Sequence, residues 1–141
     1  MSPQSASRFM SVVAIIGIIS GIMFALGGTM DIGGINDHFF HLVSSGGMGI
    51  AGIDTAEARL ALVIAGGVFA GFSAFFLYVI APAIAEGDER IKKAGILSLI
   101  IWFVTDSGGS IISGNPMNAV ANVGFLVLYA LPVLLARKEQ A

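Results

Sequence analysis

Long apolar stretches alternate with short polar ones along the chain, and four of them are long enough to cross a membrane. A hydrocarbon core about 30 Å thick requires roughly 20 apolar residues in helical form. The stretches that meet this requirement run from Phe9 to Thr29, from Ala56 to Ala81, from Ile91 to Ile112 and from Met117 to Ala136. The pattern therefore predicts an all-α integral membrane protein, with residues 1–141 forming a single domain of four transmembrane helices.

Residues at the boundaries of these stretches are typical of helix ends. The sequence Asp54-Thr55-Ala56-Glu57 resembles a capping box that opens the second helix, with Asp54 or Thr55 as its N-cap. Pro82 lies near the end of the same helix, just before a polar run. Gly114-Asn115-Pro116 leaves only a short turn between the third and fourth helices. Such a turn predicts a hairpin, and the four helices together are expected to form an antiparallel bundle.

The first apolar stretch has some features of a secretory signal peptide. Arg8 precedes it, and Ala25-Leu26-Gly27 loosely resembles a small-residue cleavage site. The run from Phe9 to Gly28 is, however, longer than the roughly 7–15 residues of a typical signal core. We therefore interpret it as the first transmembrane helix.

The connection between the first and second helices, about Met30 to Thr55, is long, rich in glycine and still apolar. A disordered loop would be more polar. The apolar residues around Phe39 and Phe40 predict a short amphipathic helix, which either lies at the membrane interface or folds back over the bundle.

The composition supports a membrane protein and excludes several other classes. Hydrophobic residues make up 56% of the chain and charged residues 11%, whereas about 25% of an average soluble domain is charged. The net charge of −2 provides no basic surface for nucleic acid. The chain contains no cysteine, which excludes disulfides, thiolate metal sites and cysteine nucleophiles.

The basic residues predict the orientation of the helices. Six of the seven fall on one side of the predicted membrane, and these six are Arg8, Arg90, Lys92, Lys93, Arg137 and Lys138. Only Arg59 falls on the other side. Because basic residues are enriched in cytoplasmic segments, both termini are expected in the cytoplasm, with the chain in a bacterial cytoplasmic membrane.

Small residues recur at spacings of three or four on the first two helices. The first helix carries Gly17, Gly21, Ala25 and Gly28, and the second carries Gly67 and Gly71, with Ala70 and Ala74 on the neighbouring face. Such faces let membrane helices approach closely. They indicate contacts within the bundle or between subunits, and the intramolecular interpretation is favoured because a bundle must first pack its own helices.

Asp106 is the most informative position, because a carboxylate at membrane depth costs several kcal/mol unless it is neutral, paired or hydrated. Ser110 lies one helical turn further along the third helix, and the start of the fourth helix presents Asn115, Asn118 and Asn122. A hairpin would bring these groups to a similar depth. The result is either a site for an ion, a proton or a polar ligand, or a set of interhelical hydrogen bonds. A third interpretation is that the helix ends early and Asp106 reaches the membrane interface.

His38 and His41 are three residues apart, so they would point the same way on a helix, with Asp31 nearby. Together they are candidates for a divalent metal site, or for ligation of haem. An interfacial patch of aromatic and histidine side chains explains the same spacing and is favoured, since a metal would need further ligands. The sequence firmly implies no cofactor.

Known catalytic motifs, including GxSxG, HExxH, the P-loop and dinucleotide fingerprints, do not occur in the chain. The sequence therefore predicts a non-catalytic protein of the lipid bilayer. One hypothesis is a structural or accessory subunit that packs with partner membrane proteins or with itself. The alternative is an oligomeric transporter, channel or ligand-binding protein with its polar site around Asp106.

Overall fold

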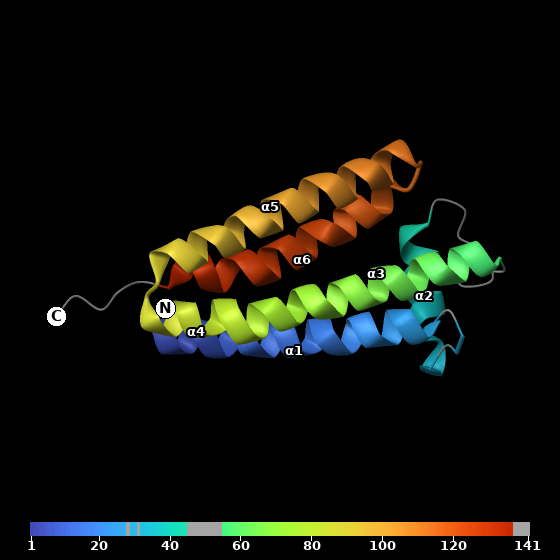
Figure 1. Ribbon diagram of the computed structural model, residues 1–141. Helices are drawn as coiled ribbons and strands as arrows, with labels where there is room; N and C mark the ends of the chain where they lie inside the picture. Colours follow the sequence, from blue (N-terminus) through green and yellow to red (C-terminus); the bar gives the residue numbers. More distant parts are fainter. Residues whose placement is uncertain (28, 31, 45–54, 137–141) are drawn as a thin grey trace.

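In the computed structural model the described residues, 1–27, 29–30, 32–44 and 55–136, fold into helices and turns (Figure 1). In chain order the elements are α1 (Pro3–Gly27), the 3₁₀ turn η1 (Ile32–Gly34), α2 (Ile35–Val43), α3 (Ala56–Phe75), the π-helical turn η3 (Phe76–Ile80), α4 (Ala81–Glu86), α5 (Glu89–Ile112) and α6 (Pro116–Leu135). Because α3, η3 and α4 are continuous, the described part of the chain has four helices long and apolar enough to cross a membrane. The predicted number of helices of membrane-spanning length and apolarity is confirmed.

Side-chain caps lie at the starts of α1 and α3. The first helix starts at Pro3, six residues before the predicted Phe9, because the Ser2 hydroxyl accepts a hydrogen bond from the backbone N–H of Ser5 at 3.3 Å. Thr55 is the N-cap of α3 and accepts from the N–H of Ala58 at 3.1 Å. The other predicted cap, Asp54, lies outside the described residues. The predicted ends of the third and fourth helices differ from the structure by no more than two residues.

The second span continues through Pro82 to Glu86, five residues beyond its predicted end. Proline has no N–H to donate and its ring crowds the preceding turn, so a regular helix breaks or bends there. Here the chain widens into η3 just before the proline. The N–H of Ala81 donates to the carbonyl of Phe76, five residues back, as a π-helical turn requires. The proline therefore modifies the helix without ending it.

The helices pack as two pairs that are close at one end of the molecule and diverge toward the other (Figure 1). One pair is α1 with α3, and the other is the hairpin of α5 and α6. At the close end, the N-terminal amino group donates to the carbonyl of Leu135 at 3.2 Å. The buried apolar core also lies toward this end and includes Met10, Ile80, Ile84 and Val133. At the opposite end the pairs are separated, and α2 lies there.

Small residues bring α1 and α3 together. A Cβ atom at Gly21 would lie 2.7 Å from the carbonyl oxygen of Gly66 and 2.5 Å from the backbone nitrogen of Ala70. This confirms the predicted small-residue face of α1 as an intramolecular contact at Gly21, while Gly28, the last predicted member of that face, lies outside the described residues. On α3, however, the packed glycine is Gly66. A Cβ at Gly67 or Gly71, the predicted pair, would meet open space, because those positions point away from α1.

The predicted helix between the first two spans is present as α2. Gly33 and Gly34 lead into it with φ values of 68° and 71°, a left-handed conformation that favours glycine. The buried Asn36 anchors α2 by donating from Nδ2 to the carbonyl of Met23 at 2.9 Å. Because α2 contacts both α1 and α6, it folds back against the bundle. Residues 45–54, the rest of this segment, lie outside the described residues.

Candidate functional site

The turn between α5 and α6 determines which side chains of the hairpin face one another. Gly114 has a φ of 83°, and the N–H of Asn115 donates to the carbonyl of Ser110 at 2.8 Å while that of Gly114 donates to Ile111 at 3.1 Å. These two bonds form a Schellman motif, which ends a helix on a left-handed glycine. Pro116 then begins α6, where its missing N–H costs nothing.

The polar residues of the hairpin are placed symmetrically about this turn. Asp106 and Asn122 are each eight residues from Gly114, and Ser110 and Asn118 are each four residues from it. Two helices that return on each other bring residues at equal distance from the turn to the same level. The sequence symmetry therefore places four polar side chains between α5 and α6.

These side chains converge on one oxygen of Asp106. Its Oδ1 accepts from Nδ2 of Asn122 at 2.9 Å, from Nδ2 of Asn118 at 3.0 Å and from Oγ of Ser110 at 3.3 Å. Asn118 also donates to Oγ of Ser110 at 2.8 Å, and Asn122 donates to Oγ of Ser107 at 3.2 Å. We call Asp106, Ser107, Ser110, Asn118 and Asn122 the polar cluster.

The predicted site and the polar cluster differ at two positions. Asn115 does not join the cluster: it lies at the start of α6, where its Nδ2 donates to the backbone and hydroxyl oxygens of Ser113 at 3.3 and 3.4 Å. Ser107 was missed because it follows Asp106 directly, on a neighbouring face of the helix. Ser107 lies at nearly the same level of the hairpin as Asn122, and this correspondence could have identified it from the sequence. The alternative interpretation, in which the third helix ends early at Asp106, is wrong, since α5 continues to Ile112.

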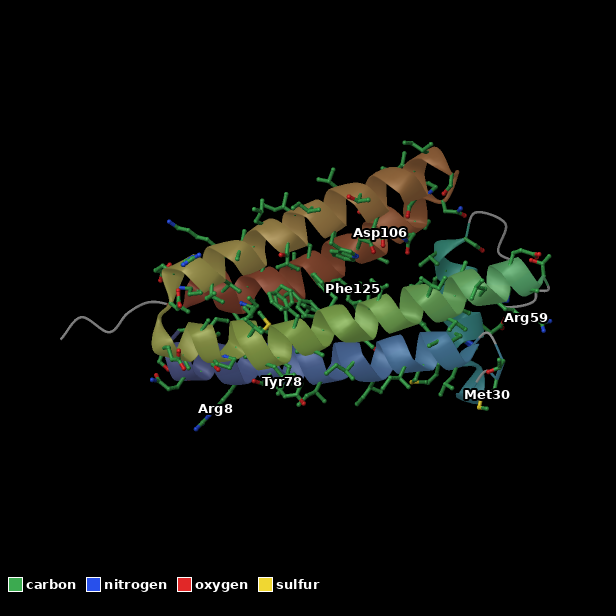
Figure 2. All side chains as sticks on the ribbon, viewed as in Figure 1. Arg8, Met30, Arg59, Tyr78, Asp106 and Phe125 are labelled. Atoms are coloured by element: carbon green, nitrogen blue, oxygen red, sulfur yellow. The ribbon has the colours of Figure 1, made fainter. Side chains whose placement is uncertain are left out.

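A cavity of about 340 Å³ lies between the two helix pairs, and the polar cluster forms part of its wall. Asp106, Asn118 and Asn122 line it from the hairpin. Its other lining residues are apolar or aromatic and come from all the helices around it: Phe24, Phe39, Phe40, Leu62, Ala65, Val68, Phe69, Phe72, Trp102 and Phe125. Figure 2 shows Asp106 and Phe125 on the hairpin, above α3.

The cavity is open along one side of α3. Ala65 and Val68 belong to its lining and are exposed, with Val68 at 65%. By contrast Asn122, deeper in the hairpin, is only 5% exposed. If the helices span a bilayer, this opening faces lipid, because an exposed side of a transmembrane helix borders the hydrocarbon region.

The aromatic wall was not predicted as part of a site. Phe69 contacts Phe125 with ring centroids 5.4 Å apart, and Phe72 lies 6.2 Å from Trp102 by the same measure. Phe24 contacts Phe39 of α2 at 4.9 Å. Aromatic residues in membrane helices usually indicate packing or lipid contact. The one available signal was their spacing on α3, since Phe69, Phe72 and Phe76 share a helical face.

The histidines are exposed, and neither lines the cavity. Nδ1 of His38 is 3.1 Å from the carbonyl oxygen of Gly34, and Nε2 of His41 is 3.6 Å from Oδ2 of Asp37. The predicted third member, Asp31, lies outside the described residues. Within the described ranges no three acidic or histidine side chains come together in a way that could hold a metal ion.

Comparisons with models of protein families, with curated proteins and with solved structures found no match to this chain.

Proposed function

We propose that the protein is a non-catalytic membrane protein that binds a small, largely apolar ligand in the cavity beside Asp106. The observation that carries the proposal is the combination of this cavity with the polar cluster. Ligand sites in proteins are typically concave, mostly apolar and provided with a few polar groups that orient the ligand. The volume of about 340 Å³ lies at the lower end of the usual range.

The hydrogen bonds of the polar cluster also support a purely structural role, in which they join α5 to α6. Two features favour ligand binding. A hairpin needs no aromatic cavity beside its hydrogen bonds, and close packing of the helix pairs would have removed it, since protein interiors contain few large voids. In addition, α2 folds over the divergent end and contributes Phe39 and Phe40 to the wall.

The proposed orientation is an antiparallel bundle with both termini in the cytoplasm. Arg8 lies at the end of the bundle where α1 begins, and Arg59 lies at the opposite end (Figure 2). Arg90, Lys92 and Lys93 follow the short turn after α4, at the same end as Arg8. The positive-inside rule then places the cavity in the outer half of the membrane.

A cavity-filling variant tests the proposal. Ala65 lines the cavity, so Ala65→Trp fills part of it, whereas Ile64→Trp places the same side chain on the exposed surface next to it. Native mass spectrometry of protein extracted in mild detergent is expected to show a bound small molecule in the wild type and in Ile64→Trp. The Ala65→Trp variant is expected to have lost it. A wild-type protein without bound molecules, or equal retention in both variants, would contradict the proposal.

A specific observation favours a second function, that of an accessory subunit. Gly67 and Gly71 form a small-residue face on α3 that no described residue covers. Faces of this kind pair membrane helices. The same mass measurement counts subunits, and Gly71→Leu is expected to dissociate an assembly formed through this face. A discrete monomer in the wild type would contradict this second proposal and leave ligand binding unaffected.

A further inference from the structure

The wall of the cavity has a distinctive chemistry. Among the described residues that line it, Asp106 is the only charged side chain, and no basic side chain lies beside it. The remaining lining residues are two carboxamides, three aliphatic side chains and seven aromatic ones. An occupant that neutralises the carboxylate would be complementary to this wall.

The two oxygens of Asp106 are not equivalent. Oδ1 already accepts from three donors, those of Ser110, Asn118 and Asn122. No described side chain donates to Oδ2, and Asp106 is half-buried in the wall of the cavity. The polar cluster thus fixes the carboxylate through one oxygen and leaves the other without a described side-chain donor.

The aromatic wall adds a second preference for positive charge. The faces of aromatic rings carry negative potential, and cations are attracted to them within about 6 Å of the ring centre, most strongly by tryptophan. Trp102 and Phe72 lie side by side in the wall, and Phe69 and Phe125 form a second pair. These rings come from α3, α5 and α6, so they surround the space in front of Asp106 from more than one side.

We infer that the ligand is a lipophilic organic cation, such as an aromatic or alkyl ammonium compound, whose positive group pairs with Oδ2 of Asp106 between the aromatic rings. This inference rests on the proposed function and names the ligand class of the same site. A metal ion fits less well, because Ca²⁺ and Mg²⁺ take about six or more oxygen ligands, and the wall offers a single carboxylate. The opening along α3 lets such a compound enter from the lipid, where its apolar part dissolves.

The experiment compares two probes of the same shape. Phenyltrimethylammonium carries a quaternary nitrogen where tert-butylbenzene carries a neutral carbon. Trp102 is the only tryptophan of the chain and lies in the cavity wall, so its fluorescence reports binding in detergent micelles. We expect the cation to bind at least about tenfold more tightly than its neutral isostere, a ratio equivalent to about 1.4 kcal/mol.

Variants separate binding at Asp106 from general attraction to a negative protein. Asp106→Asn keeps the shape of the side chain and is expected to abolish the preference for the cation while the neutral probe binds as before. Glu57→Gln removes the same charge from an exposed position outside the cavity and is expected to keep the preference. Each probe partitions into the micelle to the same extent whichever variant is present. Differences in a probe's apparent affinity between variants therefore report on the protein. Phe125→Leu, which keeps Asp106 intact, is expected to lower the affinity for the cation about threefold or more.

The outcomes are distinguishable from those of the proposed function. Equal binding of the two probes, or a preference that survives in Asp106→Asn, would overturn the cationic ligand while leaving ligand binding in place. Absence of cation binding to the wild type would also overturn the inferred ligand class. The proposed function would still be tested independently by the comparison of Ala65→Trp with Ile64→Trp.

Discussion

Two neighbouring glycines of α3 are expected to respond in opposite ways to the same substitution. Gly66 is buried against α1, whereas Gly67 is exposed. A Cβ at Gly66 would lie 2.5 Å from the carbonyl oxygen of Gly21 and 2.9 Å from Cα of Ala25, and still closer to the backbone nitrogen of Ala25. All these neighbours are backbone atoms, which cannot move aside as a flexible side chain would. The two helices must therefore separate to accept a methyl group.

The magnitude follows from two opposing effects. Overpacking of a tight contact costs about 1–3 kcal/mol. Separating two closely packed helices also weakens Cα–H···O contacts, which contribute about 0.5–1 kcal/mol each at such interfaces. Alanine regains up to about 1 kcal/mol over glycine in a helix interior. For Gly66→Ala we expect a net loss of about 2 kcal/mol in the free energy of unfolding. For Gly67→Ala only the last effect applies, so stability should rise by up to about 1 kcal/mol.

Reversible unfolding by sodium dodecyl sulfate in mixed micelles, followed by circular dichroism, measures both values. Each variant serves as the control for the other, since they carry the same substitution on consecutive residues of one helix. Equal destabilisation of both variants would refute the reasoning, because it would mean that Gly67 is also in tight contact. A neutral Gly66→Ala would refute the close approach of α1 and α3.

Three further predictions concern other parts of the bundle. The buried hydroxyls of Tyr129 and Ser73 are 2.8 Å apart. Tyr129→Phe should lower the free energy of unfolding by about 1 kcal/mol. A double-mutant cycle with Ser73→Ala should give a coupling energy of about 0.6 kcal/mol, and strict additivity of the two substitutions would contradict this. Pro82→Ala restores an N–H and should convert the π-helical turn to α-helix, visible as altered backbone carbon shifts by nuclear magnetic resonance over residues 76–80; unchanged shifts would show that another cause maintains the turn. Because the chain has no cysteine, the variants Gln4→Cys and Ser113→Cys each carry a single site for labelling. A membrane-impermeant maleimide added outside intact spheroplasts should modify only Ser113→Cys. Equal modification of both variants would exclude the proposed topology.

The elements were predictable because their signals are local. Length and apolarity define the four spans, and caps such as Thr55 define where helices begin. The early start of α1 was missed because its first turn is polar in sequence, although Ala6 is fully buried there. The continuation through Pro82 was missed because accommodation of a proline by a π-helical turn depends on hydrogen bonds that no local pattern reveals.

The polar cluster was largely predictable, and the cavity was not. Asp106, Ser110, Asn118 and Asn122 lie in one hairpin with a short turn, so their levels follow from counting along the chain. The cavity depends on how the α5–α6 hairpin sits relative to α1 and α3. That arrangement follows from contacts between distant segments, such as Phe69 with Phe125 and Phe72 with Trp102. Which glycine of α3 faces α1 is likewise a matter of rotation about the helix axis, and the spacing of glycines alone does not determine it.

The Schellman turn at Gly114 has a consequence for the changes in chain length that the protein can tolerate. Surface turns usually accept insertions and deletions with little effect. In this turn, one added residue would rotate α6 by about 100° and shift it by about 1.5 Å along its axis relative to α5. Asn118 and Asn122 would then turn away from Ser110 and Asp106, although every helix would remain intact. The length of the turn is thus as much a part of the site as the side chains, and it should vary far less than that of an ordinary loop.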